Sequence, residues 1–245
     1  MTMSLASKRI GLLVPSSNST VEVEFYRTLP HDVSLHVARL PITQVNPESI
    51  AGMVDPLESE SKKLASADVD VIVLGAAAPS FLKGMGYDRE MSQRIAQATG
   101  KPATTASTAL LQSLAALGAK RVALGTAYTT KVNDIAIAFL RANGIEVVKT
   151  ECLGYEDNLE IGRLDVQSAC DLGRRIACPE AQAIAFLCTN WQSMAIIERL
   201  ERDTGLPVLS STQFSVWAAL KTIGYAGRIE GYGRLLREMP ALPAS

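Results

Sequence analysis

The stretch RIGLLVPSSN at residues 9–18 returns 112 positions later as RVALGTAYTT at residues 121–130. The run VIVLGA, which ends at Ala76, matches AIAFLC, which ends at Cys188, at the same spacing. A third pair, TGKPATTASTALLQSLAALG from Thr99 and TGLPVLSSTQFSVWAALKTIG from Thr204, is separated by 105 residues. Internal repeats of this kind indicate two copies of one structural unit.

Within each copy, short runs rich in Val, Ile and Leu alternate with longer segments of helical period, which is typical of a parallel sheet covered by helices. The predicted strands are 10–14, 34–38, 71–74, 103–105, 122–125, 146–149, 183–187 and 208–209. The predicted helices lie near 48–66, 88–98, 107–117, 131–143, 167–177, 192–203 and 212–222. We predict an α/β fold of two Rossmann-like parallel-sheet halves related by a pseudo-two-fold axis, with the active site between them. The first half comprises residues 1–112 and 215–245, and the second comprises 113–214.

The composition narrows the class of partner. Of the 245 residues, 47% are hydrophobic, and the formal net charge is −1. Nucleic acid and membrane surfaces are therefore not expected as partners, because neither sign of charge dominates. We see no signal peptide or membrane span and expect a cytoplasmic protein. Four cysteines without CxxC spacing and only two histidines also predict no metal site. The sequence leaves the oligomeric state open between a monomer and a homo-oligomer.

Open α/β sheets bind ligands at the carboxyl ends of their strands. The loops that follow the first and third predicted strands of each half are therefore the candidate site. They span residues 15–19, 76–80, 127–130 and 188–191. Each could be an ordinary connection, but the repeat selects all four together.

Cys188 is the candidate catalytic group because it ends a predicted strand in FLCTNW, shortly before a helix expected near Gln192. A helix N-terminus favours a thiolate and attracts a carboxylate. The alternative is a small buried hydrophobic residue. The polar Thr189 and Asn190 favour the functional interpretation. Its counterpart Ala76 has no acid or nucleophile, which predicts proton chemistry with one thiol.

Other loops offer neutral donors. The segment VPSSNST places Asn18 and three serines after Pro15, and such a segment is also a good helix N-cap. Tyr128 can donate to a carboxylate or simply cover the cleft. The repeated TTAS (104–107) and LSST (209–212) segments are predicted helix caps. Neither a Gly-rich phosphate motif nor GxSxG is present, so we predict no cofactor and no serine hydrolase.

Several segments together resemble the aspartate/glutamate racemase superfamily, in the branch of maleate cis-trans isomerases and arylmalonate decarboxylases. They are PSSNST (15–20), TASTALLQSLAALGAKRVAL (105–124), YEDNLEIGRLD (155–165), CTN (188–190), LPVLSSTQFSVWAALK (206–221) and GYGRL (231–235). The resemblance implies an active site between two halves. In that superfamily, two cysteines on opposite faces of the substrate exchange protons with it. In the isomerases, one cysteine adds to the double bond and the other protonates the adduct.

The decarboxylases of this branch keep only the second cysteine, and a small residue replaces the first. By resemblance, Cys188 matches the retained cysteine and Ala76 the small residue. Asn18 and the CTN segment are closer to the isomerases, whereas Tyr128 fits both groups. Ala77 and Ala78 stand where the decarboxylases have a Thr-Ser pair that holds a carboxylate, so backbone N–H groups must replace those hydroxyls.

We therefore predict a cofactor-free decarboxylase of a malonate-type (aryl- or alkylmalonate-like) dicarboxylic acid, in which Cys188 protonates an enediolate intermediate. The predicted substrate contacts are Pro15, Asn18, Ala76, Ala77, Ala78, Tyr128, Thr189 and Asn190. The alternative is a maleate cis-trans isomerase. A racemase would need a second acid-base group, and a non-catalytic carboxylate-binding protein would keep the cleft without turnover.

Overall fold

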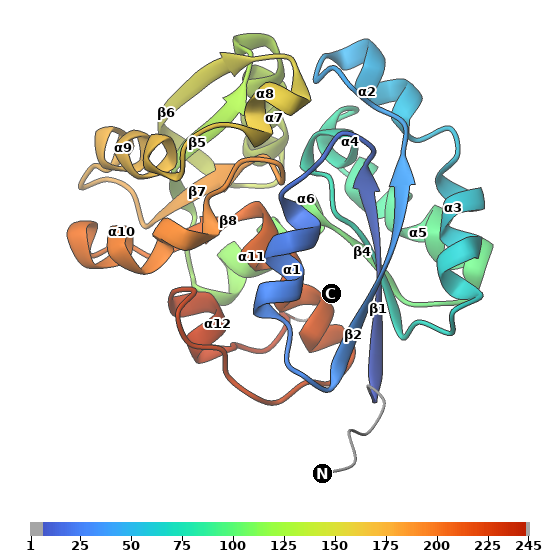
Figure 1. Ribbon diagram of the computed structural model, residues 1–245. Helices are drawn as coiled ribbons and strands as arrows, with labels where there is room; N and C mark the ends of the chain where they lie inside the picture. The colour runs from blue at the N-terminus through green and yellow to red at the C-terminus, as the bar shows by residue number, and fades with distance from the viewer. Residues whose placement is uncertain (1–6, 244–245) are drawn as a thin grey trace.

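A computed structural model describes residues 7–243 of the protein. Within that range the strands form two separate four-stranded parallel sheets (Figure 1). The first sheet contains, in spatial order, β2 (Val33–Leu40), β1 (Lys8–Pro15), β3 (Val71–Leu74) and β4 (Ala103–Thr105). The second contains β6 (Glu146–Tyr155), β5 (Arg121–Tyr128), β7 (Ala183–Leu187) and β8 (Val208–Ser210). The two orders agree strand by strand, so the predicted duplicated α/β fold is confirmed.

Helices connect the strands of both sheets. In the first half they are α1 (Val21–Thr28), α2 (Pro47–Met53), α3 (Leu57–Ala65), α4 (Ala77–Phe81), α5 (Tyr87–Thr99) and α6 (Ala106–Ala116). The remainder are α7 (Thr130–Ala142), α8 (Asn158–Gly162), α9 (Val166–Ile176), α10 (Ile197–Thr204), α11 (Ser211–Thr222) and α12 (Arg234–Glu238). The short helices α1, α4, α8 and α12 were not predicted from the sequence.

Two helix predictions are wrong. The single helix expected near 48–66 is two helices, because the chain turns at residues 54–56 and Pro56 begins α3 as its N-cap. The helix expected near Gln192 starts only with a 3-10 turn at Met194–Ile196 and continues as α10. Tertiary hydrogen bonds hold the preceding residues instead: Gln192 donates to Gly162 O, and the hydroxyls of Ser193 and Ser210 lie 2.7 Å apart.

The predicted caps form at equivalent places in the two halves. Thr105 Oγ1 accepts from Thr108 N–H at the start of α6. Ser210 forms a capping box with Gln213 at the start of α11. These side chains satisfy N–H groups that have no partner within the helix, which fixes where both helices begin.

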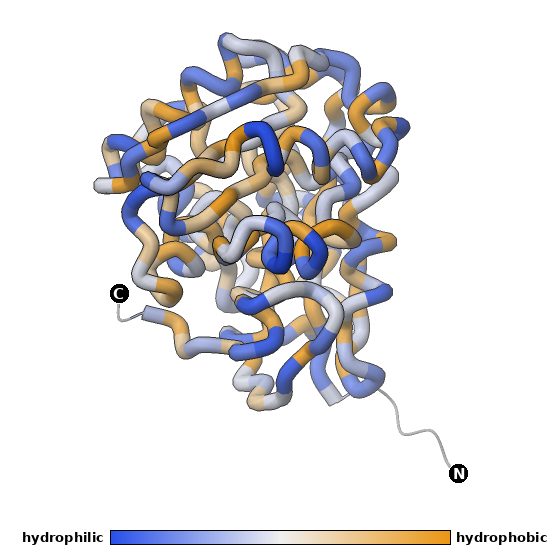
Figure 2. Tube along the Cα trace, turned by 90° about the vertical axis from the view of Figure 1, so that its left-hand side faces the viewer, coloured by the Kyte–Doolittle hydropathy of each residue, from blue (hydrophilic) through white to orange (hydrophobic). Residues whose placement is uncertain are grey.

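The core runs through both sheets and the helices between them. Every residue of β3 and β7 is buried, and Figure 2 shows hydrophobic segments concentrated inside the molecule. Helix α11, buried from Ser211 to Leu220, packs against α6 and also contacts β3 and α1 of the first half (Figure 1). The two halves therefore share one interior. Among residues 7–243, no helix combines the length and apolar character needed to cross a bilayer.

Candidate active site

The strand order of each sheet creates a crevice at the carboxyl ends of its two central strands. In the first sheet β1 lies between β2 and β3, and in the second β5 lies between β6 and β7. The chain leaves two such neighbouring strands toward opposite faces of the sheet. This leaves a crevice at their carboxyl ends, where α/β sheets bind ligands. All four predicted loops meet there, around a pocket of about 340 Å³ that includes its mouth.

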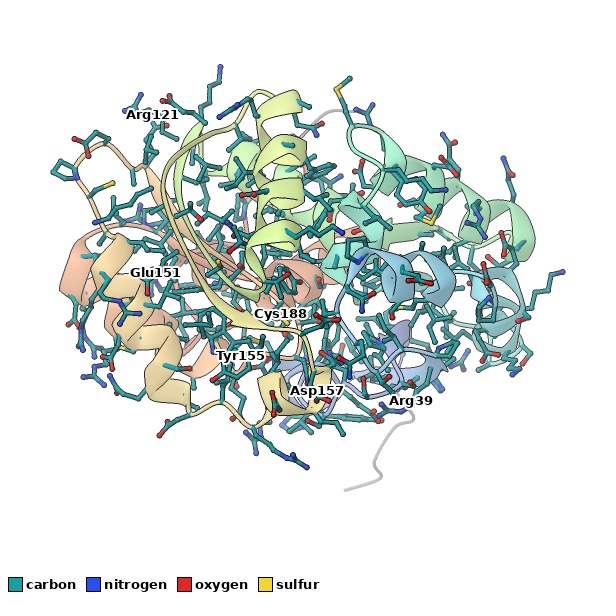
Figure 3. All side chains as sticks on the ribbon, turned by 90° about the horizontal axis from the view of Figure 1, so that it is seen from above. Arg39, Arg121, Glu151, Tyr155, Asp157 and Cys188 are labelled. Carbon is teal, nitrogen blue, oxygen red and sulfur yellow. The ribbon has the colours of Figure 1, made fainter. Side chains whose placement is uncertain are left out.

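Every predicted site residue lines this pocket: Pro15, Asn18, Ala76, Ala77, Ala78, Tyr128, Cys188, Thr189 and Asn190. Viewed from above, Cys188 lies near the middle of the molecule, where the two halves meet (Figure 3). The structure therefore brings the predicted residues together, while their roles in chemistry stay predictions.

Cys188 has an unusual backbone conformation. Its φ is +140°, a value that L-residues rarely adopt and that costs of the order of 1–3 kcal/mol. A hydrogen bond from Cys188 N–H to Ser211 Oγ (3.2 Å) holds it, and Ser211 in turn donates to Phe186 O. Strained backbone of this kind gathers at active sites, where the surrounding structure keeps a reactive group in place.

The thiol of Cys188 is buried, with 5% of the residue exposed. Burial raises the pKa of the thiol from 9.0 to about 11, against the opposing hydrogen bonds from Asn190 N–H, the Tyr128 hydroxyl and Trp191 N–H. The predicted stabilisation of a thiolate by a helix N-terminus is wrong, because no helix begins between Cys188 and Ser193. Near neutral pH, Cys188 is therefore a thiol that can give up a proton.

Tyr128 is the last residue of β5 and directs its hydroxyl toward Cys188. Its ring packs edge-on against Phe81, with the ring centroids 6.3 Å apart. Burial, followed by the nearby Cys188, raises the pKa of Tyr128 well above its usual value. The phenol consequently stays protonated and can donate a hydrogen bond into the pocket.

The polar residues of the first and last predicted loops bind one another across the halves. Asn18 Nδ2 donates to Thr189 Oγ1 (3.0 Å), and that hydroxyl donates to Gly75 O (3.0 Å). Asn190 accepts from Ser19 N–H and donates to Asn158 O. The side chains of Thr189 and Asn190 are therefore engaged within the protein. Asn18 has one further amide hydrogen that it can offer to a ligand.

The loop after β3 is small and apolar. Ala76 is the N-cap of α4, so the N–H groups of Ala77 and Ala78 belong to its first turn and have no partner within the helix. Gly75 leaves no room for a side chain, since a Cβ there would lie 2.7 Å from Leu12 Cδ1. This side of the pocket offers backbone donors and methyl groups, and no acid-base side chain.

The sequence did not single out the remaining wall of the pocket. Ile42, Val45, Ile50 and Met53, from the segment between β2 and the end of α2, form an apolar side. Asn158, the first residue of α8, contributes an amide whose Nδ2 donates to Ser17 Oγ (2.8 Å). Asn158 lies in the YEDNLEIGRLD segment, which was part of the family resemblance. Its place in that segment was the one feature of the sequence that could have indicated a role in the site.

The charge of the pocket is also informative. No Asp, Glu, Lys or Arg is among the residues that line it. Within the described residues, no group of three or more His, Cys, Asp and Glu side chains is arranged to hold a metal ion. A bound carboxylate would therefore depend on neutral hydrogen-bond donors.

The sequence model of the family described as arylmalonate decarboxylase matches residues 10–236. The chain belongs to the arylmalonate decarboxylase family. It is 31% identical to arylmalonate decarboxylase from Bordetella bronchiseptica, over 94% of this chain and 96% of that protein. It is also 31% identical to maleate isomerase from Nocardia farcinica, over 97% and 99% of the respective chains.

Solved structures agree with the family assignment. A maleate isomerase variant from Pseudomonas putida S16, crystallised with maleate, has a TM-score of 0.91 and 28% identity, covering 94% of this chain and 97% of that one. The named relatives are enzymes, decarboxylases or isomerases, and this neighbour binds a small dicarboxylate. The family thus includes two chemistries, and identity near 30% does not choose between them.

Proposed function

We propose that the protein is a cofactor-independent decarboxylase of malonate-type dicarboxylic acids, of the aryl- or alkylmalonate kind. The observation that carries the proposal is the asymmetry of the pocket: the neutral thiol of Cys188 faces in from one half, and Ala76 occupies the equivalent place in the other. One acid-base group suits a reaction that protonates a single face of a planar intermediate.

Bond cleavage would use the contrast between the apolar and polar walls. One carboxylate would lie near Ile42, Val45 and Ala76, where the loss of hydration raises its energy. The other would accept from Tyr128, Asn18 and the N–H groups at the start of α4. Loss of CO2 moves the electron pair of the broken C–C bond into the remaining carboxylate, and donors already in place stabilise the enediolate.

Protonation would complete the reaction. An enediolate is a much stronger base than a thiolate, so proton transfer from the Cys188 Sγ–H to carbon is favourable even though the thiol pKa is about 11. The same pKa makes recovery of a proton from solvent favourable near neutral pH. Cys188 would thus return to the thiol form after each turnover.

The second candidate is maleate cis-trans isomerisation, which the maleate isomerases among the relatives favour. Asn18 supports it as well, by the resemblance noted in the sequence. Cys188 would then have to add to the double bond as a thiolate, without a second cysteine opposite it. Its raised pKa opposes that role.

Incubation with phenylmalonate, with maleate and with a panel of amino acids in D2O, followed by NMR, tests both candidates. The proposal expects CO2 release and one deuterium in the phenylacetate product. Fumarate would indicate the isomerase, and α-deuteration without CO2 release a racemase. Cys178→Ser, at a half-buried cysteine outside the pocket, is the matched control for Cys188→Ser. Binding without turnover, with affinity unaffected by loss of Cys188, would leave only a carboxylate-binding protein.

A further inference from the structure

A half-buried glutamate, Glu24, lies directly behind the loop that carries Cys188. Glu24 is on α1, and its Oε1 accepts a hydrogen bond from Met194 N–H at 3.4 Å. Its Oε2 is buried and has no hydrogen-bond partner among the described residues, and the same holds for the hydroxyl of Thr212 on α11, which faces the carboxyl. The carboxyl therefore lies where α1, α11 and the segment 188–196 meet.

Each of these three elements also contacts the proposed site. Helix α1 follows the loop with Asn18, and Thr20 Oγ1 donates to Asn190 O (2.9 Å). Helix α11 begins with Ser211, which accepts from Cys188 N–H. The segment 188–196 contains Cys188 itself. A change in the charge of Glu24 would thus act on three elements that contact the Cys188 loop, without Glu24 contacting the pocket.

The protonated state of Glu24 fits this junction without a buried charge. A protonated Oε2 can donate to Thr212 Oγ1 while Oε1 still accepts from Met194 N–H, so that no buried charge and no orphan group remains. An ionised carboxyl would place a charge at a buried oxygen, and the cation that acts on it is Arg27, an exposed residue of α1. Hydrating the buried Oε2 would require the junction to open.

Water borders this junction on one side but does not reach the buried Oε2 of Glu24. A surface hollow of about 860 Å³, its mouth included, borders Glu24 between α1, the segment 192–195 and Tyr232. Among the side chains that line it, Arg27 and Tyr232 are the other titratable groups, while α9 and the segment 192–195 contribute Val166, Gln192, Met194 and Ala195. Thr212 is the group that faces Glu24 from α11.

We propose that Glu24 is a positioning residue for the proposed reaction: its protonated carboxyl holds the Cys188 loop against α1 and α11, and its ionisation releases that loop and lowers turnover. The inference rests on the proposed function for its effect on catalysis, whereas its effect on the loop stands without it. Burial, against weaker opposing effects of Thr212, Met194 N–H and Arg27, raises the pKa of Glu24 to about 7. The fall in turnover is therefore expected near neutral pH, where neither Cys188 nor Tyr128 ionises.

The test compares pH profiles of the full-length protein and its Glu24→Gln variant, with phenylmalonate and with maleate, from pH 5.5 to 9. A glutamine has the hydrogen-bonding pattern of the protonated acid. Wild-type kcat/KM should fall above about pH 7, approaching tenfold per pH unit, while Glu24→Gln stays within about threefold of the wild-type value at pH 6 throughout. Glu90→Gln, at an exposed position on α5, should behave as the wild type. The same decline in Glu24→Gln, or a flat wild-type profile, would overturn the proposal.

Tryptophan fluorescence gives a readout that needs no substrate. Trp191 follows Cys188 in the loop and Trp217 lies on α11, and they are the only tryptophans in the chain. Wild-type emission should change with a midpoint near pH 7, and Glu24→Gln should lack that transition. If neither substrate reacts while the transition occurs, the proposed function fails and the coupling of Glu24 to the loop holds; without the transition, the coupling itself fails.

A second variant covers the case in which Glu24→Gln does not fold. Thr212→Val removes the hydroxyl that lowers the pKa of Glu24, so the midpoint of the fluorescence transition should move to higher pH. An unchanged midpoint in that variant would show that the transition belongs to another group.

Discussion

The loops after β3 and β7 occupy equivalent places in a duplicated fold, yet they differ in backbone as well as in side chain. After β3, Ala76 has an ordinary φ of −144° and α4 begins at the next residue. After β7, Cys188 has a φ of +140°, and no helix begins until Met194. A difference of this size between two copies of one unit indicates that the two loops hold different parts of the site.

The comparison shows how duplication can yield a one-sided pocket. The first copy contributes small side chains and the N–H groups of a helix start, which suit an anion. The second contributes a thiol held by Ser211 beside Tyr128. Two sheets of the same order thus place unlike groups on opposite sides of one cavity, and each substitution below tests one element of that asymmetry.

The largest effect is expected from Cys188→Ser, because it removes the proposed proton donor and keeps a side chain of nearly the same shape. The kcat for whichever substrate the protein converts should fall by about 10²–10⁴-fold, the usual contribution of a general acid. Steady-state kinetics with phenylmalonate and maleate measure the change, with Cys178→Ser as the control. Retention of more than a tenth of the wild-type rate would show that the thiol is not the working group.

Tyr128→Phe should have the next largest effect. The ring keeps its edge-on contact with Phe81, and only the donor is lost. Removing one donor to a developing oxyanion commonly costs about 10²–10³ in kcat. In the first half, Ser16 is the counterpart of Tyr128 at the 112-residue spacing, and its hydroxyl donates to Ile42 O instead of facing the pocket.

Kinetics of Tyr128→Phe should therefore show a loss that Ser16→Ala does not. The exposed Tyr26, on α1, provides the matched Tyr→Phe control. Equal losses in the Tyr128 and Ser16 variants would mean that the two halves contribute alike, against the asymmetry described here.

Much of the fold and the placement of the site could be predicted from the sequence. The buried apolar runs, such as Val71–Leu74 and Ala183–Leu187, were found with the same bounds that the structure has. Since parallel strands end at one edge of a sheet, the residues that follow such runs were expected to meet, and they line one pocket.

Other features depend on tertiary contacts that no local pattern encodes. The φ of Cys188 depends on Ser211, 23 residues away in sequence. Asn158 reaches the pocket because its own N–H bonds to Thr43 O, across the two halves. Glu24 lies between Val23 and Phe25 on a short amphipathic helix, and only the packing of Met194 and Thr212 against it buries one of its carboxyl oxygens.

Glu24→Gln tests a second asymmetry, because its counterpart at the 112-residue spacing is the buried Ala136. The pKa of Glu24 is raised from 4.5 to about 7 in the folded protein, so the folded state binds this proton more tightly than the unfolded chain. This contribution to stability is full below about pH 4.5 and is lost as the pH rises to about 7. That interval corresponds to up to about 3 kcal/mol.

Urea unfolding at pH 4.5 and pH 8 measures the effect. Relative to the wild type, Glu24→Gln should gain up to about 3 kcal/mol in the free energy of unfolding between the two pH values, since glutamine has no proton to lose. Other carboxyl groups cancel in this difference. A difference that does not vary with pH would show that Glu24 ionises as freely in the folded protein as in the unfolded chain.

The smallest effect separates the two backbones directly. Cys188→Gly and Cys188→Ala both remove the thiol, but only alanine keeps a Cβ at a φ of +140°. Glycine should therefore be the more stable of the two by about 1 kcal/mol, after allowance for its larger entropy in the unfolded chain. At Ala76, where φ is −144°, glycine relieves no strain, and Ala76→Gly should destabilise the protein by about 0.5–1 kcal/mol.

Thermal or urea unfolding of the three variants gives the sign of the glycine effect at each position. Opposite signs are expected because only the second copy strains its chain to present a thiol, whereas glycine being less stable at both positions would mean that the loops share one backbone conformation.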